Sequence, residues 1–205
     1  MKRLVFSLAS LLMAAVSLTA HAQVSGDAAA GERLVAVCAA CHGADGNSEL
    51  GSNPKLAGQN ARYTLKQLLD IKSGARPVPL MTGLLDNLSE QDLRNIAAFY
   101  ASQEATLEGA NAELVELGER IYLGGIEDLG VASCTACHSP NGGGVAQAGY
   151  PALSGQHAEY TAAQMRAFRA GDRDNDGDAA PMRTVAERLT DREIEALASY
   201  ISGLH

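Results

Sequence analysis

The 205 residues carry a formal net charge of −8, and they include no Trp and few other aromatic side chains. An acidic chain of this kind disfavours nucleic acid as a partner, because phosphates attract cations, and it permits steering toward a positively charged protein. The shortage of large side chains indicates that something bulky other than an amino acid helps to fill the core.

Residues 1–22 are interpreted as a secretory signal peptide. A short basic start precedes an apolar run at 4–18, and the segment ends in AHA, an A-x-A cleavage pattern. The apolar run is short for a transmembrane helix, which needs about 20 residues. Cleavage before Gln23 leaves 183 residues, enough for one or two domains.

The remainder of the chain is a tandem duplication with a period of about 100 residues, too long for a solenoid unit. The stretch starting at Pro54, PKLAGQNARYTLKQLLDIKSGAR, recurs from Pro151 as PALSGQHAEYTAAQMRAFRAGDR. A small, polar seam at 102–112 separates the copies. We therefore expect two similar domains, at 23–107 and 108–205.

Each half is predicted to be mostly helical. An Ala-rich opening helix is expected at Ala28–Ala40, with a shorter counterpart at 112–122, and middle helices at 61–73 and 158–170. Each half closes with a helix that starts at a capping-box pattern, Ser89 with Asp92 and Thr190 with Glu193, followed by apolar residues at i, i+3, i+4 and i+7. Because no segment shows strand alternation, the predicted fold class is all-α.

Both halves contain a C-x-x-C-H motif, and these motifs hold all four cysteines of the chain. A zinc site does not need a histidine directly after the second cysteine, a thioredoxin-like dithiol expects a βαβ setting, and a disulfide leaves the histidine unexplained. The remaining interpretation is covalent attachment of haem c. It predicts thioethers at Cys38, Cys41, Cys134 and Cys137, and proximal iron ligands at His42 and His138.

A comparison of the halves suggests the second axial ligand of each iron. Met81 and Met182 each precede the closing capping box by 8 residues, and both follow a proline in segments expected to be irregular. A thioether on such a loop can reach the open face of an iron. Met165 aligns with Leu68 and is expected to fill the core. His157 aligns with Asn60 and has no twin, so it is expected to be a surface or structural histidine, as is the terminal His205.

Two further features accompany these motifs. Pro54 lies 12 residues after His42, and Pro151 lies 13 after His138. A carbonyl near each proline could orient the histidine ring, or each proline could simply form a turn. The segment Asp172–Asp178 resembles the start of a calcium loop, but Arg183 stands where a calcium loop has Glu. We interpret it as an acidic, solvated insertion.

With C-x-x-C-H, P-x-L-x-G-Q, a Tyr-containing helix and a loop Met in each half, the chain resembles the dihaem cytochromes of the c4 type. The resemblance implies two tandem cytochrome c-like helical domains, each wrapped around one covalently bound haem c and related by approximate twofold symmetry. It also implies His/Met ligation, by His42 with Met81 and by His138 with Met182. It further implies periplasmic electron carriage in a respiratory chain, in some members with peripheral membrane association. A quinol:cytochrome c reductase is the kind of donor expected, and a terminal oxidase the kind of acceptor.

The expected function is electron transfer rather than enzyme catalysis. With His and Met on both irons no coordination position is free for a substrate, and no extra His or carboxylate cluster is placed for catalysis. The alternative is a dihaem redox enzyme or its electron-transfer subunit, of the peroxidase or thiosulfate dehydrogenase type. The acidic excess is larger in the second half, net −7 at 110–205 against −3 at 23–109, which could orient the protein on redox partners.

Overall fold

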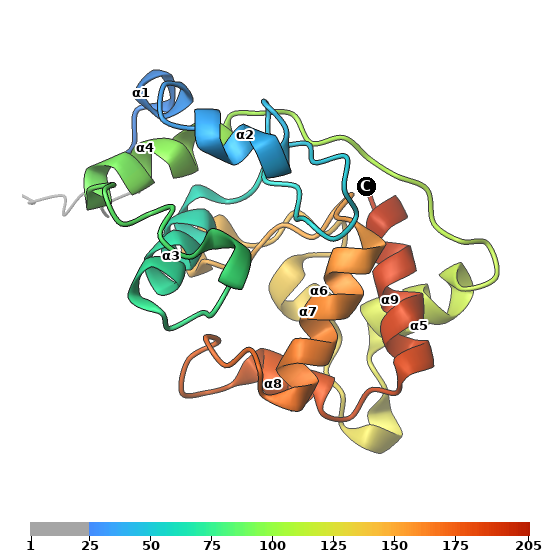
Figure 1. The fold of residues 1–205 in the computed structure, drawn as a ribbon. Coiled ribbons are helices and arrows are strands. Elements are labelled where there is room, and N and C mark those ends of the chain that lie inside the picture. The colour runs from blue at the N-terminus through green and yellow to red at the C-terminus, as the bar shows by residue number, and fades with distance from the viewer. Residues whose placement is uncertain (1–24) are drawn as a thin grey trace, which may run out of the picture.

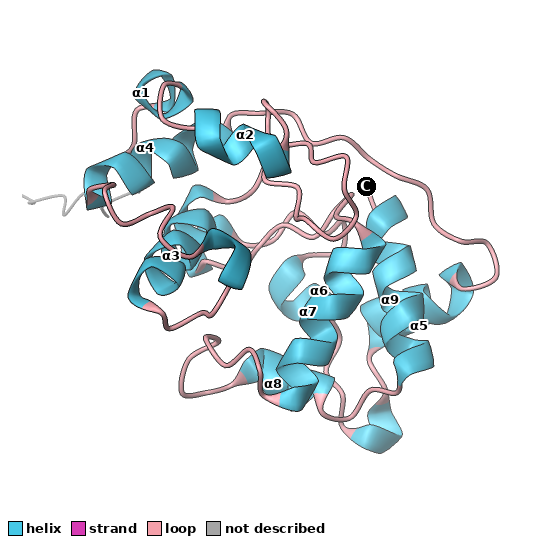
Figure 2. Ribbon diagram, in the orientation of Figure 1, coloured by secondary structure: helices cyan, strands magenta, loops and turns pink. Residues whose placement is uncertain are grey.

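The computed structural model describes residues 25–205, so the interpreted signal peptide lies outside the described residues. The described part is helical and contains no β-strand (Figure 2). It has only two isolated β-bridges, Ile126 to Val131 and Val145 to Tyr150. No helix among these residues has the length and apolar character needed to cross a membrane. The two halves of the sequence lie side by side, the first in blue to green and the second in yellow to red (Figure 1).

Within the described residues, the first half contains four α-helices and one 3-10 turn. The expected single opening helix is in fact two helices, because the chain turns at residues 33–35. The turn allows Gly31 to lie against the closing helix while Val35 is buried in the core. The elements are α1 (Ala28–Glu32), α2 (Ala36–His42), α3 (Ala61–Ser73), η1 (Pro79–Met81) and α4 (Glu90–Ala101).

The second half repeats this order with longer connections. Its middle helix and that of the first half have the predicted bounds, and both closing helices begin after capping boxes whose two reciprocal hydrogen bonds are present. Two short 3-10 turns, one before α6 and one after it, have no counterpart in the first half. The elements are α5 (Val115–Gly124), η2 (Glu127–Leu129), α6 (Thr135–His138), η3 (Ala146–Ala148), α7 (Ala158–Ala170), α8 (Pro181–Ala186) and α9 (Asp191–Gly203).

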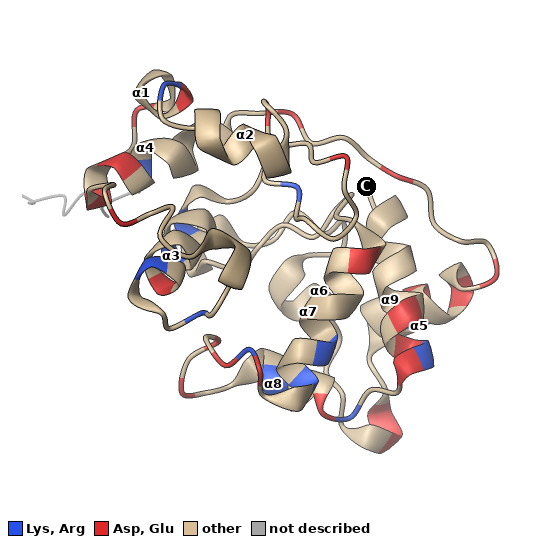
Figure 3. Ribbon diagram, viewed as in Figure 1, with Lys and Arg blue, Asp and Glu red and all other residues tan. Residues whose placement is uncertain are grey.

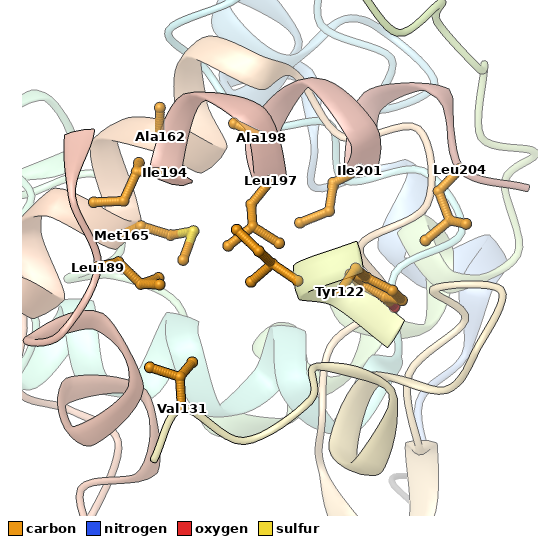
Figure 4. Close-up of a cluster of buried hydrophobic side chains, with 11 residues drawn as sticks. Tyr122, Val131, Ala162, Met165, Leu189, Ile194, Leu197, Ala198, Ile201 and Leu204 are labelled. Atoms are coloured by element: carbon orange, nitrogen blue, oxygen red, sulfur yellow. The ribbon is translucent and has the colours of Figure 1, made fainter. Parts of the chain in front are cut away.

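Each half closes over its own hydrophobic core. In the first half, α4 contributes Leu93, Ile96 and Tyr100 to a buried cluster. In the second, α9 contributes the corresponding helical face, and Tyr122 of α5 and Met165 of α7 pack against it (Figure 4). Met165 is therefore the core residue that its alignment predicted. Burying one such large apolar side chain contributes roughly 1.5–3 kcal/mol.

Two glutamines join the halves through reciprocal hydrogen bonds. The Gln59 amide donates to the Ala152 carbonyl (2.9 Å) and accepts from the Ala152 N–H (2.8 Å). Gln156, its twin, makes the same pair of bonds with the backbone of Lys55, at 3.0 and 2.9 Å. This exchange shows that the halves meet around an approximate twofold axis.

Two arginines cross the same junction, between α3 and α7. Arg76 donates to the Tyr160 hydroxyl (3.0 Å) and to Gln164 (2.9 Å) in the second half. Arg173 donates to Tyr63 and Gln67 in the first half, both at 3.1 Å. Among the described residues neither guanidinium has a carboxylate within ion-pair distance, so neutral oxygens bind both charges. The network therefore ties the halves together by directed hydrogen bonds rather than by apolar packing.

Candidate haem sites

Both C-x-x-C-H motifs lie on short helices. Cys38, Cys41 and His42 belong to α2, and the spacing i, i+3, i+4 places all three on one side of the helix. In the second motif Cys134 is the N-cap residue of α6, which ends at His138. The predicted thioether and proximal-ligand residues are thus brought together within each motif by local helical geometry.

The two histidines are oriented by backbone carbonyls. Nδ1 of His42 lies 2.9 Å from the Pro54 carbonyl oxygen, and Nδ1 of His138 lies 3.0 Å from that of Pro151. A carbonyl only accepts, so Nδ1 carries the proton and the lone pair is on Nε2. Burial lowers the pKa of both rings, although the carbonyl bond acts in the opposite direction. Each ring is therefore held in the neutral form that binds a metal through Nε2. The sequence left open whether a carbonyl near each proline orients the histidine, and in the structure the carbonyls of Pro54 and Pro151 themselves do so.

The four cysteines are unpaired, so neither motif forms a disulfide. Burial raises the pKa of the Cys38 thiol, and it raises that of Cys134 to about 11. A zinc ligand or a redox dithiol needs a stabilised thiolate, which is the opposite shift. Within residues 25–205 no group of three or more His, Cys, Asp or Glu side chains could hold a metal ion by itself. The raised thiol pKa values of Cys38 and Cys134 suit addition of S and H across a vinyl group.

Met81 lies close to the first motif. It ends η1, is half-buried, and packs with Cys38 against the same cluster of α4 side chains. Together with Ile71, Pro79 and Leu85 it lines a pocket of about 480 Å³. The structure thus places the predicted second ligand on the same core as the attachment site.

Met182 departs from its predicted setting. It lies in the helix α8, not in an irregular loop, and Pro181 begins that helix because a missing N–H costs nothing at the first helical position. Ala186 of α8 is buried and Val185 packs on the second core, as does Cys134. Met182 itself is half-buried and is not among the side chains of that core. Helix α8 therefore connects the predicted ligand to the core that holds the second motif.

The preceding acidic insertion is only partly solvated. Asp172, Asp174 and Asp178 are exposed as expected, but the Asp176 side chain is only 5% exposed and pairs with Arg183 (2.7 Å). The interpretation of the whole segment as solvated is therefore wrong for the buried Arg173 and for the Asp176 carboxylate. The reason is that the start of α8 supplies hydrogen-bond donors that this carboxylate reaches only in the folded chain.

His157 is a structural histidine at the junction of the halves, not an iron ligand candidate. Its Nε2 lies 2.7 Å from the Ser48 carbonyl oxygen, and its Nδ1 lies 2.6 Å from a carboxylate oxygen of Glu108. Glu108 also pairs with the buried Lys55 at 3.1 Å. Both ring nitrogens are thus used in contacts with the first half and the connecting segment. His205 is exposed.

Two tyrosines beside the motifs were not anticipated from the sequence. Tyr100 of α4 is buried against Cys38, and its hydroxyl has no oxygen or nitrogen hydrogen-bond partner among the described residues. Tyr122 of α5 lies near Cys134 and donates to the Ser139 carbonyl (2.8 Å). In the repeat, Tyr100 aligns with Ile201 and Tyr122 with Val35, so each half has one tyrosine on a different helix. The presence of one tyrosine in each half at non-equivalent positions was the sequence signal that could have pointed to them.

The residues present fit a covalently attached haem in each half. Two thiols, an imidazole with a free Nε2 and a half-buried thioether are the donor set that haem c requires. The orphaned hydroxyl of Tyr100 also fits, because a buried polar atom next to Cys38 is left to be satisfied by a group other than protein.

Comparisons with known proteins place the chain among the cytochromes c. The cytochrome c family model matches residues 28–104 and 115–205. The chain is 54% identical to a cytochrome c4 of Pseudomonas aeruginosa, over 97% of this chain and 98% of that protein. It is 38% identical to a thiosulfate dehydrogenase electron acceptor of Stutzerimonas stutzeri, covering 82% of this chain and 78% of that one. The crystal structure of reduced recombinant cytochrome c4 from Pseudomonas stutzeri superposes with a TM-score of 0.87 at 53% identity, covering 88% of this chain and all of that one.

Proposed function

The chain belongs to the cytochrome c4 family of electron carriers with two haem c groups, and on this premise we propose that His42 with Met81 and His138 with Met182 ligate its irons. The thioethers in this proposal form at Cys38, Cys41, Cys134 and Cys137. The observation that carries it is the pair of Nδ1 bonds to the Pro54 and Pro151 carbonyls, which leave both Nε2 atoms free as ligands.

When bound, each haem iron takes up or releases one electron by cycling between the ferric and ferrous states. The residues of the chain supply what this exchange needs. The carbonyls fix the rings, and burial keeps the rings neutral. The Met81 and Met182 thioethers would hold the irons together with the histidines, and this would leave no position for a substrate and limit rearrangement. Met/His ligation in an apolar surround raises the reduction potential.

Replacement of each methionine tests the ligation. Met81→Ala or Met182→Ala is expected to lower the potential of one haem by a substantial part of the roughly 0.8 V span that axial ligands control. The same haem is expected to bind CO in the ferrous state. A redox titration followed by optical and EPR spectra measures both effects. Met165→Leu is the control, because it removes a thioether from the second core while nearly keeping the side-chain volume. A methionine variant with unchanged potentials and no CO binding removes that residue as ligand.

We further propose that the protein works in the periplasm and accepts electrons from a quinol:cytochrome c reductase for delivery to a terminal oxidase. The segment 1–22 supports export, and purified exported protein is expected to begin at Gln23 by mass spectrometry. The uneven charge supports docking on a basic partner. Acidic residues of the second half lie on α5 and α9 (Figure 3).

A second partner is favoured by the relatives. A protein named as a thiosulfate dehydrogenase electron acceptor shares 38% identity with this chain, so a thiosulfate dehydrogenase is the alternative donor. Stopped-flow mixing of the oxidised protein with each reduced candidate donor distinguishes them. Fast reduction by the quinol-oxidising complex alone supports the respiratory assignment, and fast reduction by the dehydrogenase alone overturns it.

A further inference from the structure

The insertion before Met182 has an inward-facing carboxylate that the function described so far does not use. Four more residues separate Arg173 from Met182 than separate Arg76 from Met81. Most of the insertion is exposed, but Asp176 points back toward α8. One of its oxygens accepts the N–H groups of both Met182 and Arg183, each at 3.0 Å. The other oxygen accepts from Nε of Arg183 at 2.7 Å.

The start of α8 needs such an acceptor. Ala180 precedes the helix with φ of +46°, a left-handed conformation that is uncommon for alanine, and its side chain cannot cap the helix. Pro181 has no N–H. The first N–H groups without an acceptor in the helix are therefore those of Met182 and Arg183, and Asp176 satisfies both. The backbone of the proposed iron ligand is thus fixed by a side chain six residues before it.

The residue before Asp176 anchors the insertion on the first half of the molecule. Asn175 donates to Gln67 (3.0 Å) and to Asp70 (2.6 Å), both on α3. Lys66 of the same helix donates to the Asn175 carbonyl (2.7 Å). Adjacent residues therefore face opposite ways, one toward the first half and one toward the Met182 backbone. Asp176 therefore belongs to a segment that is anchored on the first half, not to a free loop.

The first half holds its methionine in another way. The N–H of Met81 donates to the Val78 carbonyl (2.8 Å) within the η1 turn. Among the described residues no side chain accepts from the Met81 N–H. The two proposed ligands are therefore held by different means. A local backbone turn holds Met81, and a carboxylate in the insertion holds Met182.

We infer that Asp176 is a positioning residue for the second iron: it holds the backbone of Met182 in place, with Asn175 as its anchor on the first half, and so keeps the thioether ligated. This inference rests on the proposed ligation by Met182. It assigns the insertion a role in the ligand stability and potential of one haem, and it leaves the first haem independent of Asp176.

The variant Asp176→Ala tests the inference in the haem-loaded protein. CO binding by one ferrous haem is expected to become about tenfold faster, the order set by the loss of hydrogen bonds to a charged group, and that haem's potential is expected to fall. The other haem is expected to stay unchanged. Asp178→Ala is the matched control, because Asp178 is exposed in the same insertion and makes no hydrogen bond within the described chain. Asp176→Asn, which keeps the volume, serves in the same assays if the alanine variant does not fold.

Met182→Ala separates the possible failures. If this variant leaves both haems closed to CO, the ligation itself is wrong. If it opens one haem but Asp176→Ala and Asp176→Asn change only the stability of the fold, the positioning role is overturned. In the double variant Asp176→Ala with Met182→Ala, CO binding is expected to equal that of Met182→Ala alone. An additional effect in the double variant also overturns the role, because Asp176 would then act on the haem by another route.

Discussion

Two glycines, Gly31 in α1 and Gly118 in α5, set how closely the helices cross at the level of single residues. A Cβ added at Gly31 would lie 2.1 Å from the Asn95 carbonyl oxygen of α4, and one at Gly118 would lie 2.2 Å from that of Ala196 in α9. Neither distance is compatible with a real side chain, and both contacts are to backbone, which cannot rotate away. The same contact occurs in both halves, so these glycines set the distance between α1 and α4 and between α5 and α9.

Gly118→Ala is expected to destabilise the protein by about 1–3 kcal/mol, because the helices must move apart to admit a methyl group. Gly124→Ala is the matched control within α5, since nothing lies within 4 Å of its added Cβ. That control is expected to be neutral or to stabilise by up to about 1 kcal/mol through lower chain entropy. Urea unfolding of the haem-loaded protein measures both. Equal stability of the two variants contradicts the close-crossing argument.

At the scale of elements, capping boxes define where the closing helices begin. Before α4 the Ser89 hydroxyl accepts from the Asp92 N–H (3.2 Å), and the Asp92 carboxylate accepts from the Ser89 N–H (2.8 Å). Thr190 and Glu193 repeat the arrangement before α9. The bonds from Ser89 lower the pKa of Asp92 below its ordinary value of 3.8. Because α4 and α9 carry most of each core, these local bonds set the register of the main buried faces.

Ser89→Ala is expected to cost about 1 kcal/mol, as loss of an N-cap hydroxyl does. Because the pKa of Asp92 is lowered in the folded state, the contribution of the capping box to stability depends on pH. Its bonds stabilise the fold fully above the ordinary value of 3.8, and this stabilisation is lost as the pH falls through the lower pKa of the folded state. The difference in unfolding free energy between wild type and Ser89→Ala should therefore shrink in acid. Ser52→Ala, at an exposed position, is the control. If the difference in unfolding free energy between wild type and Ser89→Ala does not change with pH, the reciprocal hydrogen bonds of the capping box do not contribute as described.

At the scale of the whole molecule, the halves meet through polar contacts arranged around the approximate twofold axis. The glutamine pairs, the crossing arginines and the His157–Glu108 contact all join groups that are far apart in the sequence. Such contacts give the junction a defined geometry, because a small displacement breaks several hydrogen bonds at once. The relative placement of the two proposed irons therefore depends on these side chains.

Gln156→Ala is expected to weaken the coupling of the halves by about 1–3 kcal/mol, since it leaves the N–H and carbonyl of the buried Lys55 without partners. Calorimetry is expected to show a broader transition or two transitions in place of one. Gln147→Ala is the control, because that exposed side chain makes no hydrogen bond within the described chain. A single unfolding transition with unchanged midpoint contradicts a coupling role for Gln156.

The sequence by itself determined what depends on neighbours along the chain. The C-x-x-C-H motifs, the helices at 61–73 and 158–170, and the capping boxes follow from side chains three or four positions apart, and the duplication identified the paired methionines. Tertiary structure alone decided the break before α2, the helical setting of Met182 and the choice of the Pro54 and Pro151 carbonyls as histidine partners. It also decided the inward turn of Asp176, because a carboxylate in an acidic stretch looks solvated until the start of α8 offers it three hydrogen-bond donors. Local patterns encode local hydrogen bonds, whereas these contacts arise only when the packed cores bring separate segments together.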